Sequence, residues 1–138
     1  MIKLVVGISS LQEYYKHQQR QLMRYDGKLA TPCLTRYQPR EAEAMLKSGG
    51  SIYRVINKRI ACRHKILGFE HVETHKGTMC AIMQDAAIMR TVPMTRKPFQ
   101  GWRYLKDKDA PDDMDIYCGG IVEDEADILA GLKEAGLL

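Results

Sequence analysis

The most regular alternation of apolar and polar positions in the chain lies in residues 51–67. Two runs rich in β-branched residues, 51–56 and 59–67, flank Asn57-Lys58, and asparagine tolerates the left-handed backbone that a two-residue hairpin turn requires. The pattern therefore predicts a β-hairpin, around which we expect the rest of the sheet to be organised.

A strand and a helix are predicted ahead of this hairpin. Residues 2–8 are β-branched and almost continuously apolar, which is typical of a buried strand near the centre of a sheet. Ser10 and Glu13 then have the spacing of a capping box, and apolar side chains recur on one side of the segment that follows. We expect this helix to end at Asp26-Gly27.

Two more helices are predicted, one before the hairpin and one at the end of the chain. Pro39 suits the first position of a helix over residues 39–47, and Ser48-Gly49-Gly50 would stop that helix. Apolar residues recur at helical spacing beneath an acidic face in residues 123–134, which predicts a C-terminal helix.

Elsewhere the apolar pattern is shorter and more often interrupted. We expect Pro32 to lie on an edge strand or at a strand start, because proline has no N–H to donate to a neighbouring strand. The remaining predictions are strands over residues 31–37, 78–83 and 99–105, a single helical turn over residues 85–90, and a loop over residues 106–115.

Together these elements predict an α+β fold in a single domain, residues 1–138. The turn chemistry favours a mostly antiparallel, curled sheet or small β-barrel with two or three flanking helices. A chain of 138 residues can bury one core of this kind without disulfides.

Charge is distributed unevenly along the chain. Residues 1–104 contain 18 Lys and Arg against 7 Asp and Glu, whereas residues 105–138 contain 3 against 10. A basic body, residues 1–104, followed by an acidic C-terminal part, residues 105–138, favours a polyanionic partner for the body. The alternative, which the sequence leaves open, is that the two parts attract each other.

Composition favours a cytoplasmic protein. The apolar N-terminal run is too short for a secretory signal, and no stretch approaches the roughly 20 apolar residues of a membrane span. The four cysteines lack the spacing of a disulfide framework. We therefore expect reduced thiols and no membrane partner.

The first candidate site is the basic hairpin. Cations at alternating strand positions point to one side, so Arg59 and Arg63 would lie together, as phosphate contacts require, with Arg54 on the neighbouring strand. The alternative is an exposed edge strand that Lys and Arg protect from aggregation.

The second candidate site is the aromatic and basic stretch of residues 96–104. Gln100, Trp102, Arg103 and Tyr104 combine groups that suit an unpaired base: rings for stacking, a guanidinium for phosphate and an amide for the base edge. A lone tryptophan is more often a large core side chain, and that interpretation of Trp102 stays open.

A metal site is a third possibility. Cys62, His64, His71, His75 and Cys80 offer nitrogen and sulfur ligands, but their spacing matches no standard zinc motif, so we expect no metal. The chain also shows no nucleophile motif and no calcium-loop spacing, and we expect no cofactor.

Six short motifs are spread over nearly the whole chain: Thr35-Arg36, Pro39-Arg-Glu-Ala-Glu43, Gly49-Gly-Ser-Ile-Tyr53, Pro98-Phe-Gln-Gly-Trp-Arg-Tyr-Leu105, Asp109-Ala-Pro111 and the terminal Gly136-Leu-Leu138. Together they resemble the bacterial family called domain of unknown function 1489. The eight-residue block that starts at Pro98 is the most specific of the six. The resemblance implies no established activity.

The order of Thr35-Arg36, a short helix, Gly49-Gly50 and a basic hairpin is similar to that of PUA-like domains. The similarity is strongest to ASCH domains, small β-barrels associated with RNA or modified nucleobases. It implies a ligand groove near Thr35, Arg36 and the hairpin. Some ASCH-like proteins are amidohydrolases that use a Lys, a Thr and a Glu, but the Lys expected just before the Thr is absent here, where Pro32 and Cys33 stand.

These observations lead to one expected function and two alternatives. We expect an α+β or small PUA-like β-barrel module that binds RNA, single-stranded nucleic acid or a modified nucleotide. The first alternative is a small hydrolase that acts on a nucleoside or another anionic metabolite, with Thr35 and Glu70 or Glu73 assisting. The second is a protein-interaction subunit that pairs through an edge strand. The oligomeric state stays open. The expected ligand-binding residues are Thr35, Arg36, Arg54, Arg59, Arg63, Gln100, Trp102, Arg103 and Tyr104.

Overall fold

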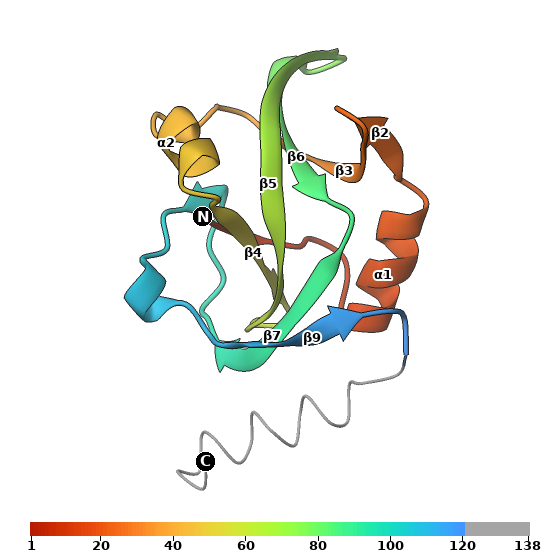
Figure 1. Ribbon diagram of the computed structural model, residues 1–138, viewed down its shortest axis with the longest axis vertical. Coiled ribbons are helices and arrows are strands. Elements are labelled where there is room, and N and C mark those ends of the chain that lie inside the picture. Colours follow the sequence, from red (N-terminus) through yellow and green to blue (C-terminus); the bar gives the residue numbers. More distant parts are fainter. Residues whose placement is uncertain (121–138) are drawn as a thin grey trace, which may run out of the picture.

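A computed structural model describes residues 1–120 of the chain (Figure 1). This part contains two α-helices, nine strands and one 3-10 helix. In chain order they are β1 (Ile2–Leu4), α1 (Leu11–Gln19), β2 (Met23–Tyr25), β3 (Lys28–Thr35), α2 (Ala42–Lys47), β4 (Ser51–Ile56), β5 (Arg59–Thr74), β6 (Gly77–Asp85), β7 (Ile88–Thr95), β8 (Trp102–Arg103), η1 (Asp107–Asp109) and β9 (Asp113–Tyr117).

Strand β5 organises the sheet because it is long enough to pair with three other strands. Residues 59–65 pair with β4 along one edge, and residues 59–63 also pair with β7 along the other edge. The last part of β5, residues 66–74, pairs with β6. Figure 1 shows β5 running most of the height of the molecule, with β7 and β9 at its lower end. The strand path is β2-β3-β6-β5-β4-β1-β8, with β7 beside β5 and β9 beside β7.

The sheet is mixed and is not closed into a barrel. Among the strand pairs of residues 1–120, only β1 with β4 is parallel. The predicted α+β class and the mostly antiparallel pairing agree with this sheet. The barrel alternative is wrong, because β2 and β8, at the two ends of the path, do not pair with each other in the described part of the chain.

The central hairpin is confirmed at the predicted turn. Strand β4 ends at Ile56 and β5 begins at Arg59, while Asn57 and Lys58 have φ values of 51° and 64°. Two adjacent residues with positive φ are typical of a type I′ turn, whose twist matches that of the strands it joins.

Helix α1 begins as predicted but ends earlier. The Ser10 hydroxyl accepts a hydrogen bond from the backbone N–H of Glu13 at 3.1 Å, which is the interaction that their spacing predicts. The predicted end at Asp26-Gly27 is wrong, because the helix stops at Gln19. Asp26 and Gly27 have φ values of 49° and 79° and form the turn between β2 and β3. An Asp-Gly pair suits such a hairpin turn as well as a helix end, and the pairing of β2 with β3 decides between them.

Helix α2 is shorter than predicted and stops where predicted. It begins at Ala42 instead of Pro39. It ends at the two glycines: Gly49 has a φ of +70°, and the N–H of Gly50 donates to the carbonyl of Met45 at 2.8 Å. Neither of the described helices has the length and the apolar character that crossing a membrane requires.

The second half of the chain holds more strand than its sequence predicts. The predicted helical turn over residues 85–90 is wrong: the Asp85 carboxylate accepts from the N–H of Ala87 at 2.9 Å in a tight turn, and β7 begins directly afterwards. Pairing of β7 with β5 and β9 over long sequence separations outweighs this local signal. Three other predictions need correction: the first strand ends at Leu4 instead of residue 8, residues 99–105 contain a strand of only two residues, and the predicted loop 106–115 contains η1 and the start of β9. The predicted C-terminal helix over residues 123–134 lies outside the described residues.

Tyr25 covers a small apolar cluster formed by Ala30, Ala81 and Met83. Its hydroxyl donates to the Glu70 carboxylate at 2.7 Å, so the ring is fixed by this hydrogen bond as well as by its packing on the cluster. The ring lies directly over Gly68: a Cβ at position 68 would clash with the hydroxyl and lie 2.8 Å from the ring carbon Cζ. Gly68 is therefore required by close packing.

Gly68→Ala is expected to lower the free energy of unfolding by about 1 to 3 kcal/mol, because the Tyr25 ring must move off the apolar cluster. Urea unfolding of the purified protein measures this change. In a Tyr25→Ala background the same substitution should cost about 0.5 kcal/mol or less, since the clash is gone. An equal cost in both backgrounds would show that Tyr25 is not the obstacle.

Candidate nucleic-acid interface

A pocket of about 550 Å³ lies where β7 ends and the chain continues towards β8. Arg96, Lys97 and Arg103 are its charged residues, and no carboxylate of the described chain lines it. The guanidinium carbons of Arg96 and Arg103 lie 5.9 Å and 5.4 Å from the centre of the Phe99 ring, which is cation–π distance. We call this the cationic pocket; its lining residues are Thr95, Arg96, Lys97, Pro98, Phe99, Arg103 and Tyr104.

The turn of the central hairpin lies beside the cationic pocket. Arg59 pairs in register with Thr95, and the N–H of Arg96 donates to the carbonyl of Lys58 at 2.7 Å. Lys58, Arg96, Lys97 and Arg103 form no ion pair with a carboxylate of residues 1–120. The turn of the basic hairpin and the stretch that begins at Arg96, which are far apart in the sequence, therefore meet at one surface.

Backbone contacts and one aromatic pair position the side chains of residues 100–104. Nη1 of Arg103 donates to the carbonyls of Gln100 and Trp102 at 2.8 Å and 3.0 Å. Trp102 is half-buried against a core cluster, and its ring meets the Tyr104 ring edge to face with 4.8 Å between the ring centres. Tyr104 remains 47% exposed. Trp102 thus supports Tyr104 from behind, while Tyr104 faces solvent.

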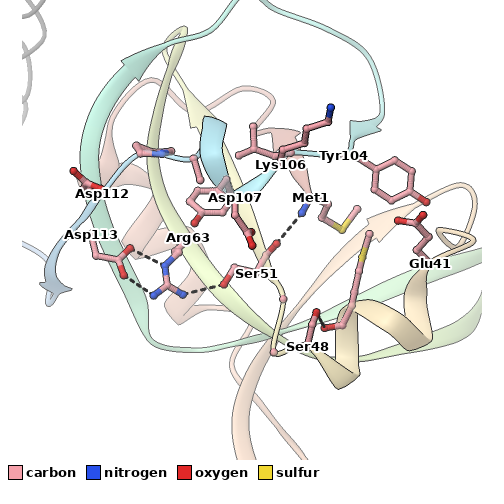
Figure 2. Close-up of a pocket in the computed structure, with 17 residues that line it drawn as sticks. Met1, Glu41, Ser48, Ser51, Arg63, Tyr104, Lys106, Asp107, Asp112 and Asp113 are labelled. Carbon is pink, nitrogen blue, oxygen red and sulfur yellow. Dashed lines mark hydrogen bonds and ion pairs between the residues drawn. The ribbon is translucent and has the colours of Figure 1, made fainter.

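A larger pocket of about 860 Å³, which we call the polar pocket, lies between α2, the start of β4 and the segment that joins β8 to β9. Figure 2 shows Tyr104 and Glu41 at one side of it, Arg63 and Asp113 at the other, and Asp107 between them. Tyr104 lines this pocket as well as the cationic pocket. The two pockets therefore share one wall.

Two arginines of the basic body bind the acidic segment that contains β9. Arg63 donates from Nε and Nη2 to the two carboxylate oxygens of Asp113 at 2.7 Å and 2.6 Å. Arg90 binds Asp115 in the same way at 2.8 Å and 3.0 Å. The hydrogen bonds from Arg63 lower the pKa of the Asp113 carboxyl. Attraction between the two parts, which the sequence leaves open, is present here, and Arg63 already has a carboxylate partner.

Arg54 lies in the core and is only 6% exposed. Its Nη1 donates to Oε1 of Gln84 at 2.9 Å and to the hydroxyl of Tyr14 at 3.4 Å, and its Nε donates to the carbonyl of Lys3 at 3.4 Å. All three partners are neutral acceptors. Amide Nε2 of Gln84 in turn donates to the hydroxyl of Thr31 at 3.1 Å.

His64 continues this set of contacts. Its Nδ1 lies 2.7 Å from the carbonyl of Asp85, which can only accept, so Nδ1 carries the hydrogen. Nε2 is then an acceptor, and the Tyr14 hydroxyl donates to it at 2.8 Å. Burial lowers the pKa of His64 to about 4. We call Thr31, Gln84, Arg54, Tyr14 and His64 the buried network.

Thr35 and Arg36 lie away from both pockets. Thr35 is buried, and Arg36 is exposed with its guanidinium carbon 5.9 Å from the centre of the Tyr37 ring. Thr35 and His71 lie opposite the same residue of β6, so their side chains point to the same face of the sheet. Glu70 directly precedes His71 in β5, so its side chain points to the opposite face. The structure therefore does not bring Thr35 and Glu70 together.

Among residues 1–120, no three or more His, Cys, Asp or Glu side chains are grouped so as to hold a metal ion. Cys62 is fully buried, and burial raises the pKa of its thiol to about 12. His64 belongs to the buried network, and His71 and His75 lie exposed near the end of β5.

Comparison with known proteins shows the family of the chain. A family model described as "Protein of unknown function (DUF1489)" matches residues 1–138. The chain belongs to the DUF1489 family. No curated protein and no solved structure matches the chain. The resemblance drawn from the six sequence motifs is thus confirmed for DUF1489.

Of the residues that line the polar pocket of this DUF1489 protein, sequence analysis predicted only Arg63 and Tyr104 as ligand-binding residues. Glu41, Tyr53 and Asp107 come from three separate segments, and the Asp-rich stretch after residue 105 looks like solvated charge. The local sequence carries no signal that these segments meet. Besides these two residues, the related signal is the Gly49-Gly50 pair, which ends α2 at the rim of the pocket.

Proposed function

We propose that this protein binds single-stranded nucleic acid, RNA in particular, through the cationic pocket and the adjoining hairpin turn. The observation that carries the proposal is the lining of that pocket: three cations and two aromatic rings, with no carboxylate among its described residues. Cations suit the phosphates of a polyanion, and exposed rings suit unpaired bases.

The proposal assigns different roles to the cations of the basic body. Lys58, Arg96, Lys97 and Arg103 contact phosphate, with Arg59 and Gln100 adjoining the same surface. Arg54 and Arg63 are left out of the contact set, because Arg54 is bonded inside the core and Arg63 is bonded to Asp113.

Substituting Lys97→Ala together with Arg103→Ala is expected to weaken binding of a single-stranded RNA about tenfold at low salt, because two phosphate contacts are lost. Each contact releases counterions, so the slope of log affinity against log salt should become shallower by about 1.4. Fluorescence anisotropy with a labelled oligonucleotide, repeated between about 50 and 200 mM salt, measures both quantities.

The matched control is Arg24→Ala together with Lys76→Ala, which removes the same charges from two exposed positions outside both pockets. This control should leave affinity within about twofold of the parent, apart from the small effect of net charge. The proposal fails if the parent protein does not bind single-stranded RNA or DNA at low salt. It also fails if the two double variants weaken binding equally.

A further inference from the structure

We propose that the polar pocket receives one unpaired base of the strand whose phosphates lie at the cationic pocket. We further propose that it favours bases with an exocyclic amino group, guanine above all. This inference rests on the proposed function and adds to it a site of sequence preference.

The polar pocket and the cationic pocket adjoin each other at Tyr104. Tyr104 lines both pockets, is 47% exposed, and is held by its edge-to-face contact with Trp102. Arg103 precedes Tyr104 directly and belongs to the cationic pocket. A nucleotide with its phosphate at Arg103 therefore has its base within reach of the Tyr104 ring, on which it can stack.

The charges of the polar pocket indicate which part of a nucleotide it suits. Its carboxylates are Glu41, Asp107, Asp112 and Asp113, and its side-chain cations are Arg63 and Lys106. Arg63 and Asp113 satisfy each other as a bidentate pair. The remaining three carboxylates outnumber Lys106 and the N-terminal ammonium of Met1, which also lines the pocket, so a second phosphate is disfavoured and a neutral ligand that donates hydrogen bonds is favoured.

Unused hydrogen-bonding capacity lies in the same pocket. Tyr53 is partly buried there, and burial raises the pKa of its hydroxyl. Within residues 1–120 that hydroxyl has no hydrogen-bond partner, and it shares the pocket with Asp107 and with the Arg63–Asp113 pair. A base edge placed between Tyr53 and Asp107 would supply the missing partners.

The chemistry of the four bases then sets the preference. A carboxylate only accepts hydrogen bonds, and guanine presents two adjacent donors, N1–H and the exocyclic amino group, to one carboxylate. Adenine and cytosine each offer one amino group. Uracil offers a single N–H between two carbonyl acceptors, which carboxylates repel. We therefore expect guanine to bind most tightly, and uracil least tightly among the four.

The test uses oligouridine nonanucleotides that carry guanine, adenine, cytosine, uracil or an abasic site at the central position, measured with the full chain by fluorescence anisotropy. Central guanine should bind about tenfold more tightly than central uracil, and the abasic strand should bind no more tightly than the uracil strand. Asp107→Asn should remove most of the preference for guanine. Asp109→Asn, in the same 3-10 helix but outside the pocket, should keep it.

Two variants of Tyr104 test whether its ring stacks on the base. Tyr104→Phe should keep the difference between guanine and the abasic strand, because the ring remains, whereas Tyr104→Ala should reduce that difference about tenfold. Equal affinities for all five strands, with binding intact and salt-dependent, would overturn this inference and leave the proposed function standing. Absence of binding to every strand would overturn both.

Discussion

Arg54→Ala is expected to lower the free energy of unfolding by about 3 to 5 kcal/mol, the largest effect of any single substitution considered for this protein. The substitution removes a long side chain from a closed core and leaves acceptors on Gln84 and Tyr14 without their donor. The measurement is urea unfolding followed by circular dichroism, with the midpoint and the slope fitted separately.

Arg36→Ala is the matched control for Arg54→Ala, because Arg36 is exposed and its contact is with the Tyr37 ring at the surface. That variant should unfold within about 1 kcal/mol of the parent. Arg54→Met separates volume from hydrogen bonding, since it fills the space without donating, and we expect an intermediate loss. If Arg54→Ala costs no more than Arg36→Ala, the guanidinium is not buried as described.

Acid is expected to destabilise the protein by about 3 kcal/mol through His64 alone. Burial, with a further contribution from the Arg54 charge, lowers the pKa of His64 from an ordinary 6.5 to about 4 in the folded state. Between pH 6.5 and pH 4 the unfolded chain therefore binds a proton at this position that the folded chain does not bind. The free energy of unfolding should fall as pH drops through this window and level off for this group below it.

Urea unfolding at a series of pH values measures the effect, and a His64→Gln variant isolates it. Carboxylates titrate in the same pH window, so the informative quantity is the difference in free energy of unfolding between the parent and the His64→Gln variant at each pH. That difference should shrink as pH falls from 6.5 to 4. His75→Asn, at an exposed turn position, should keep the pH profile of the parent. A parent and a His64→Gln variant with parallel profiles would rule out a neutral, buried His64.

The structure divides the basic body into cations with different physical roles. Arg54 stabilises the core, Arg63 and Arg90 fasten the acidic segment, and Lys58, Arg96, Lys97 and Arg103 stay without carboxylate partners in residues 1–120. A net positive charge in sequence is therefore a poor measure of a binding surface. Only the last group contributes to the proposed interface.

The sequence by itself determined the features that depend on neighbouring residues. The positive φ values of Asn57 and Lys58 fit a two-residue hairpin turn, Ser10 caps α1 through Glu13, and Gly49 ends α2. Each of these signals acts over a few residues, through backbone sterics or one local hydrogen bond, so a local reading of the chain is enough. The six family motifs are likewise recognisable in the sequence alone.

Only the tertiary structure decided which side chains are buried and which lie together. Alternation from Ile52 points Arg54 inward, but a buried guanidinium is tolerated only because Gln84 and Tyr14 arrive from β6 and α1. Tyr104 becomes a shared wall because the chain after β8 lines one pocket together with α2 and the start of β4. These outcomes depend on contacts between residues tens of positions apart, and no local pattern records such contacts.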